Sequence, residues 1–111
     1  MKSISDRAEV SVDFPNKAYM GAFGRESSFE VKVEPDEVLL RIVRPGEERR
    51  EIGVHLHYLL LADILVQLGQ GLVQHDFLDE LHLGKLREGA EALVQALRDR
   101  RPAPSESRKQ G

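Results

Sequence analysis

The 111-residue chain has no cysteine and no tryptophan, and aromatic residues make up only 5% of it. Without cysteine, the chain can form no disulfide, thiolate zinc site, iron–sulfur cluster or thiol nucleophile. With so few aromatic rings, it has little material for the stacking surfaces that bind single-stranded nucleic acid. A cysteine-free sequence suits a reducing compartment, and we expect a cytoplasmic protein.

An excess of positive charge is also lacking, because the formal net charge is -3 and the pI is about 5.8. Nucleic-acid binding needs a basic surface, so we expect no nucleic-acid partner. The most apolar run, 56–68, contains Asp63 and Gln67 and is shorter than the roughly 20 residues that a membrane span needs. The first residues lack the apolar stretch of a signal peptide, and we expect no membrane partner.

Sequence signatures of catalysis are missing as well. The chain has no Gly-x-Ser-x-Gly motif, Walker A loop or dinucleotide-binding fingerprint. We therefore expect a protein that is not an enzyme and that uses no cofactor.

The composition, with 41% hydrophobic and 32% charged residues, is typical of one folded domain. A chain of this length can bury roughly two thirds of the surface that its unfolded form exposes. We expect a flexible N-terminus at 1–7, a single α+β domain at 8–101, and a disordered tail at 102–111, which is rich in proline and charge.

Five segments alternate between apolar and polar residues, as half-buried strands do: 8–14, 17–23, 27–34, 38–42 and 52–56. Two-residue turns at Pro15-Asn16 and Pro35-Asp36 separate the members of the first two pairs. The second turn predicts that Val33 lies opposite Val38 and that Glu30 faces Arg41, a favourable charge pair. Similarly, Ile42 can face Ile52 only across a loop with an odd number of residues, about five.

From residue 58 the apolar period becomes helical, and we predict one helix over 58–73 and a second that begins after Asp76 as its N-cap. All five strands place their apolar residues on one face, which needs a cover. The predicted fold is therefore α+β, with a five-stranded antiparallel meander and two C-terminal antiparallel helices packed on one face.

The first helix is apolar over an arc of roughly 240°, far more than the 100° or so that one partner surface requires. The surplus arc predicts an interface with a second copy or with another protein. We place this interface at four leucines on one helical face: Leu61, Leu65, Leu68 and Leu72.

The histidines offer a different hypothesis, a metal or small-ligand site near the junction of sheet and helices. His55 and His57 share one strand face, a spacing that suits metal ligands but needs further ligands. His75, Asp79 and His82 would share one helical face only if the helix began early, whereas the Asp76 cap leaves His75 outside. Semi-buried or capping histidines are the simpler interpretation of both groups.

Three weaker candidates remain, each with a simpler interpretation. The loop Gly21–Ser28 could cradle an anion, but Glu26 opposes it and a plain hairpin loop is favoured. Four arginines near the fourth turn are interleaved with glutamates, which favours a solvated, charge-balanced loop. Asp63 lies within the most apolar helix, yet it aligns with Gln67 on the narrow polar stripe, so we expect it to be exposed.

Overall fold

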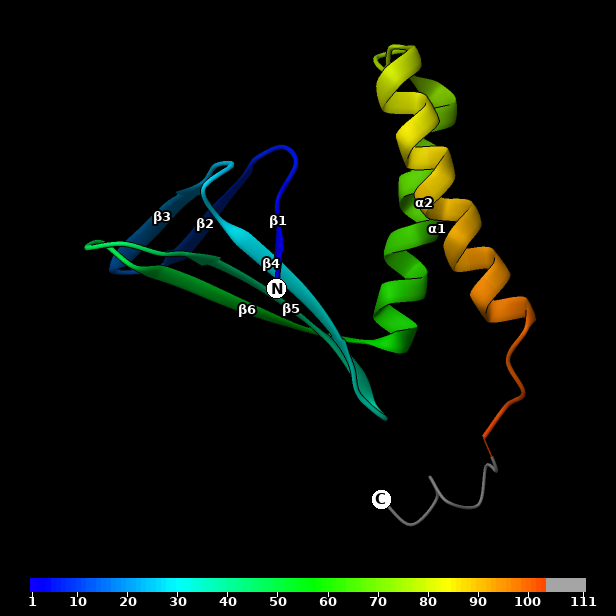
Figure 1. The fold of residues 1–111 in the computed structure, drawn as a ribbon, viewed down its shortest axis with the longest axis horizontal. Helices are drawn as coiled ribbons and strands as arrows, with labels where there is room; N and C mark the ends of the chain where they lie inside the picture. Colours follow the sequence, from blue (N-terminus) through cyan, green and yellow to red (C-terminus); the bar gives the residue numbers. More distant parts are fainter. Residues whose placement is uncertain (104–111) are drawn as a thin grey trace. The chain divides into compact units, whose positions relative to one another are not determined.

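The computed structural model describes residues 1–103, and it confirms the α+β class with antiparallel sheets followed by two helices (Figure 1). The predicted disordered tail at 102–111 lies almost entirely outside the described residues. The elements are β1 (Lys2–Ser3), β2 (Ala8–Phe14), β3 (Lys17–Phe23), β4 (Ser28–Val33), β5 (Glu37–Arg44), β6 (Arg50–His57), α1 (Tyr58–Gln74) and α2 (Glu80–Arg98).

The chain divides into two compact units, Met1–Gly71 and Leu72–Gly111. The first unit contains the six strands and most of α1. The second contains the end of α1 and all of α2.

The predicted pairing of β4 with β5 is confirmed residue by residue. Val33 pairs with Val38 and Glu30 with Arg41, as a two-residue turn with matched apolar faces requires. In that turn, the Glu34 amide donates a 2.9 Å hydrogen bond to the Glu37 carbonyl. Alternation and turn length together were thus sufficient to specify the register.

The pairing of β5 with β6 also agrees with the prediction. Ile42 pairs with Ile52, and the five residues from Pro45 to Arg49 form the loop. Within that loop Gly46 has a φ of 114°, a left-handed conformation that glycine adopts without a steric penalty.

The prediction of one five-stranded meander is wrong, because the strands form two sheets (Figure 1). One sheet has the order β1-β4-β5-β6, and the other is the β2–β3 hairpin. The hairpin has the predicted register, with Val12 opposite Tyr19, but β3 does not pair with β4. Instead β1 takes the outer edge of β4, where Lys2 pairs with Phe29 and Ser3 with Ser28.

The turn after β3 explains this separation. The Ser27 amide donates to the Gly24 carbonyl at 2.9 Å, and the Ser27 carbonyl accepts from the Ile4 amide at 3.1 Å. The backbone that would have continued a β3–β4 ladder is therefore used by the turn and by the segment after β1. The hairpin leaves the plane of the first sheet here, and β3 lies against β5.

The core of the first unit lies where the N-terminal segment crosses the apolar face of the sheet. Phe23 is 1% exposed and Ile42 is 8% exposed, and these are the buried hydrophobic side chains among the described residues. A hollow near them is lined by residues from Ile4 to Ala8 together with Phe29 and Leu40. This part of the apolar face is thus covered by the chain's own first residues.

Helix α1 spans Tyr58–Gln74, one residue longer than predicted. Helix α2 begins at Glu80, and its N-cap is Asp79 rather than the predicted Asp76. Asp79 has extended backbone angles, φ -79° and ψ 179°, and its carboxylate accepts a 2.9 Å hydrogen bond from the His82 amide. That geometry satisfies one of the free amides of the first turn, which is what an N-cap does.

Neither helix has a buried residue. The half of the apolar sheet face away from Phe23 is also exposed, with Val31 at 55% and Val33 at 74%. The packing of the two helices on one face of the sheet stays a prediction.

Candidate functional site

The polar face of the larger sheet carries a network of charges centred on Arg41. Its guanidinium donates to Glu30 at 2.9 Å, and to Glu51 at 3.1 and 2.8 Å from two nitrogens. These hydrogen bonds, that to Glu51 first, raise the pKa of Arg41 above its usual value. They also lower the pKa of Glu51, to which Arg49 adds a second hydrogen bond at 2.8 Å.

Three of the four arginines near the fourth turn lie against carboxylates. Arg41 and Arg49 are paired with carboxylates, and Arg44 lies 3.5 Å from the Glu26 carboxylate beside the Gly24–Ser27 turn. The geometry favours the charge-balanced interpretation of the arginine cluster. An anion in the glycine loop would also have to displace Glu26 from its arginine.

The structure brings His55 and His57 to one carboxylate that the sequence analysis missed, Glu37. His55 Nδ1 lies 2.5 Å from Glu37 Oε2, and His57 Nε2 lies 3.4 Å from Glu37 Oε1. Glu37 could have been predicted as a partner from the sequence, because the strand register that pairs Ile42 with Ile52 also pairs Glu37 with His57. Among residues 1–103, however, no three side chains of histidine, aspartate or glutamate are arranged to hold a metal ion.

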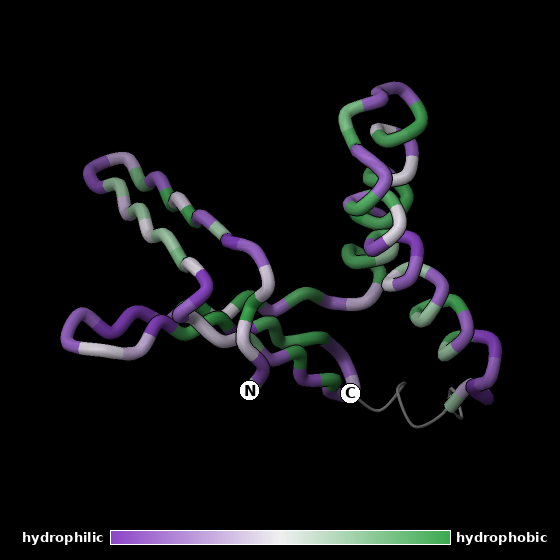
Figure 2. Tube along the Cα trace, turned by 45° about the horizontal axis from the view of Figure 1, so that its top comes forward, coloured by the Kyte–Doolittle hydropathy of each residue, from purple (hydrophilic) through white to green (hydrophobic). Residues whose placement is uncertain are grey.

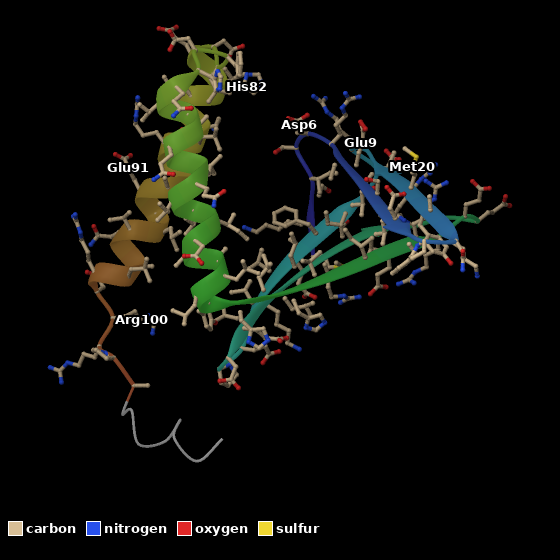
Figure 3. All side chains as sticks on the ribbon, turned by 180° about the vertical axis from the view of Figure 1, so that it is seen from behind. Asp6, Glu9, Met20, His82, Glu91 and Arg100 are labelled. Atoms are coloured by element: carbon tan, nitrogen blue, oxygen red, sulfur yellow. The ribbon has the colours of Figure 1, made fainter. Side chains whose placement is uncertain are left out.

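His75 and His82 lie in the second unit, and because α2 begins at Glu80 the alternative of one helical face with His75, Asp79 and His82 does not arise. His75 stacks on Phe77, with ring centroids 4.7 Å apart and planes at 10°. His82, near the start of α2 in Figure 3, places Nδ1 2.6 Å from Asp79 Oδ1. The backbone hydrogen bond from His82, followed by that from its side chain, lowers the pKa of Asp79. This carboxylate is thus engaged as a helix cap.

Asp63 is exposed, as expected for a residue on the polar stripe of α1. Gln67, one turn further on, is exposed as well.

Hydrophobic residues recur along both helices and the strands (Figure 2), and many of them are exposed among residues 1–103. The predicted interface leucines are mostly exposed: Leu65 is 41% exposed, Leu68 50% and Leu72 39%, and Leu61 has intermediate burial. Helix α2 repeats the pattern on its own apolar positions, which include Leu83, Leu86, Leu93, Val94 and Leu97, all more than 40% exposed.

The β2–β3 hairpin exposes apolar side chains too. Phe14 and Tyr19 pack edge to face, with centroids 6.2 Å apart, yet both are more than half exposed. Met20, on the opposite face, is 83% exposed and points away from the hairpin in Figure 3. Single exposed apolar residues are ordinary, but rows of them on successive elements are typical of interaction surfaces.

The chain matches no protein-family model, and comparison with curated proteins and with solved structures found no similar protein. Neither helix in the described part has both the length and the hydropathy of a membrane-spanning segment. Any proposal about function therefore rests on the residues of this chain and their arrangement.

Proposed function

We propose that this protein is a non-enzymatic, cytoplasmic interaction module that acts as a homodimer. The observation that carries the proposal is the exposure of the apolar positions of α1, none of which is buried within the chain. Full burial of one leucine or valine side chain contributes roughly 1.5–3 kcal/mol. A row of such side chains left in water is a large driving force for association.

A second copy suits this surface better than an unrelated partner does. The chain has an apolar sheet face that needs a cover and two helices with apolar stripes that need a support. In the proposed dimer the four α1 leucines pack against the other copy. The helices and the apolar sheet faces of both chains together then form the two layers that the strand pattern predicts.

Sedimentation velocity at micromolar concentration tests the proposal, and we expect a dimer. Leu68→Glu places a charge on the apolar stripe and should shift the protein to monomer. Gln67→Glu adds the same charge one residue away, on the polar stripe, and should leave the dimer intact. A wild-type monomer at these concentrations would contradict the proposal, and so would equal effects of the two substitutions.

A second candidate is a metal- or small-ligand-binding role for His55 and His57, and a metal there would need ligands beyond those that residues 1–103 bring together. Glu37 lies against both imidazoles, and all three side chains are on the strand face that carries the charge network. A metal at 100 times its Kd should stabilise the fold by about 2.7 kcal/mol. A thermal-shift series with Zn²⁺, Ni²⁺ and Co²⁺ on the wild type and on Glu37→Gln tests this role, and no shift with any of them would contradict it.

A further inference from the structure

The two edges of the larger sheet differ in how they are protected. The outer edge of β4 is paired at Ser28 and Phe29 by β1, and Lys32 and Pro35 follow in or just after the strand. Lysine, proline and short cover strands are the usual means by which proteins block edge-to-edge association.

The outer edge of β6 has none of these protections. No strand among residues 1–103 pairs with that edge, and β6 reads Arg-Glu-Ile-Gly-Val-His-Leu-His, without lysine or proline. Gly53, Val54 and His55 in its middle are all exposed. The backbone amides and carbonyls on the free side of an eight-residue strand are a ready template for another strand.

We infer that β6 pairs antiparallel with β6 of a second copy, around a two-fold axis that passes beside Val54. The inference rests on the proposed homodimer and specifies how its chains meet. Around that axis Val54 faces Val54, Ile52 faces Leu56, and Glu51 faces His57. The two four-stranded sheets become one continuous sheet, whose apolar rows run on from one copy into the other.

Side-chain chemistry selects this register over its neighbours. A two-fold axis requires that each residue faces the same partner in both directions. Centring the axis at Gly53 would set Arg50 against Leu56 on the apolar face. Centring it at His55 would set imidazole against imidazole and leave Ile52 without a partner. Among these registers, the axis at Val54 sets all three apolar residues of the strand, Ile52, Val54 and Leu56, opposite one another, and it also sets Glu51 opposite His57.

The absence of cysteine makes the inference directly testable by cross-linking. Residues opposite each other in an antiparallel pair have Cα atoms roughly 4.5–5.5 Å apart, within the range of about 4.4–6.8 Å that a disulfide spans. Under mild oxidation at micromolar concentration, Val54→Cys should form covalent dimers. The matched control is Val33→Cys, which lies on the same face of the sheet but on β4, on the other side of β5.

We expect Val54→Cys to cross-link roughly a hundredfold faster than the control, because paired thiols meet at about millimolar effective concentration. A mixture of Ile52→Cys and Leu56→Cys chains should cross-link faster than either variant alone, which checks the register. Far-UV circular dichroism confirms that each variant is folded.

The outcomes separate this inference from the proposed function. A wild-type dimer in which Val54→Cys cross-links no faster than Val33→Cys overturns the strand pairing and leaves the homodimer standing. Rapid cross-linking of Val54→Cys together with equal rates for the mixed and single variants overturns the register. A monomeric wild type overturns both the pairing and the homodimer.

Discussion

Two regions of the first unit, the covered end of the sheet and helix α1, have similarly apolar sequences but opposite burial. At the sheet end Phe23 is 1% exposed and Ile42 8%, whereas in α1 no residue is buried and Leu68 is 50% exposed. The difference is that residues 4–8 and the hairpin pass over the first region. Amphipathic periodicity therefore places apolar residues on one face, but that face becomes a buried core only when a second segment packs against it.

The polar face of the sheet provides the opposite case. Arg41 finds both of its carboxylates, Glu30 and Glu51, on the two strands beside its own. Cross-strand partners on one face are determined by register alone, so the network needs no further element. The apolar face needs a facing layer, and residues 4–8 and the hairpin provide one near Phe23 and Ile42.

The largest expected effect comes from the covered region. Phe23→Ala should destabilise the protein by about 3–5 kcal/mol, because it removes a fully buried ring and leaves a cavity. Urea unfolding at fixed protein concentration measures the change. Tyr19→Ala is the matched control on the same strand, where the ring is 54% exposed, and it should cost less than about 1 kcal/mol. Similar losses for the two variants would show that the hairpin's outer residues are buried in the working assembly.

A smaller effect is expected where α1 begins. The Tyr58 hydroxyl donates a 2.7 Å hydrogen bond to the Glu34 carbonyl in the β4–β5 turn. Tyr58→Phe should cost about 0.5–1.5 kcal/mol, since it removes that bond and keeps the ring. Tyr19→Phe is the control, because the Tyr19 hydroxyl makes no hydrogen bond within residues 1–103, and it should leave the unfolding midpoint unchanged. Hydrogen exchange in the first turn of α1 should accelerate in Tyr58→Phe alone.

The smallest expected effect concerns the charge network at low pH. Hydrogen bonds from Arg41 and then Arg49 lower the pKa of Glu51 below 4.5 in the folded state. A lowered folded-state pKa stabilises the fold above the unfolded value, and that stabilisation disappears as the pH falls through the lowered pKa. Glu51→Gln should therefore be less stable than wild type at pH 7, and the difference should shrink below pH 4.5. Thermal unfolding from pH 7 to pH 3 measures it.

Glu48→Gln is the control for that titration. Glu48 lies in the exposed β5–β6 loop and has no ion-pair partner within the described residues. Its substitution should leave the pH dependence unchanged. A pH profile of Glu51→Gln parallel to that of wild type would show that the network contributes nothing to acid stability.

Much of the local structure could be predicted from the sequence because strand registers depend on short-range information. A two-residue turn and a row of matched apolar residues were sufficient to pair Val31 with Leu40, and the odd loop length paired Ile42 with Ile52. The Glu37 partner of His57 follows from the same register. The position of the α2 cap was wrong by three residues, because Asp76 and Asp79 are both good caps and only the backbone geometry distinguishes them.

The arrangement of these hairpins could not be predicted. No pattern in the sequence indicates that β1 pairs with β4, since Lys2 and Ser3 form a two-residue strand without alternation. Once β1 occupies that edge, β3 cannot, and the hairpin turns out of the sheet. The predicted interface at Leu61, Leu65, Leu68 and Leu72 stays a prediction, with exposure as its support.

Strands β2 to β6, their turns, the pairing within each hairpin and the two helices follow from the amino-acid sequence alone, because each depends on neighbours a few residues away or on the periodicity of one face. The division of the strands into two sheets, and the burial of Phe23 and Ile42 but not of the α1 leucines, depend on long-range contacts in the folded chain. Different segments of the chain compete for the same sheet edge or the same apolar face. Which segment pairs with that edge or covers that face depends on contacts between residues far apart in the sequence.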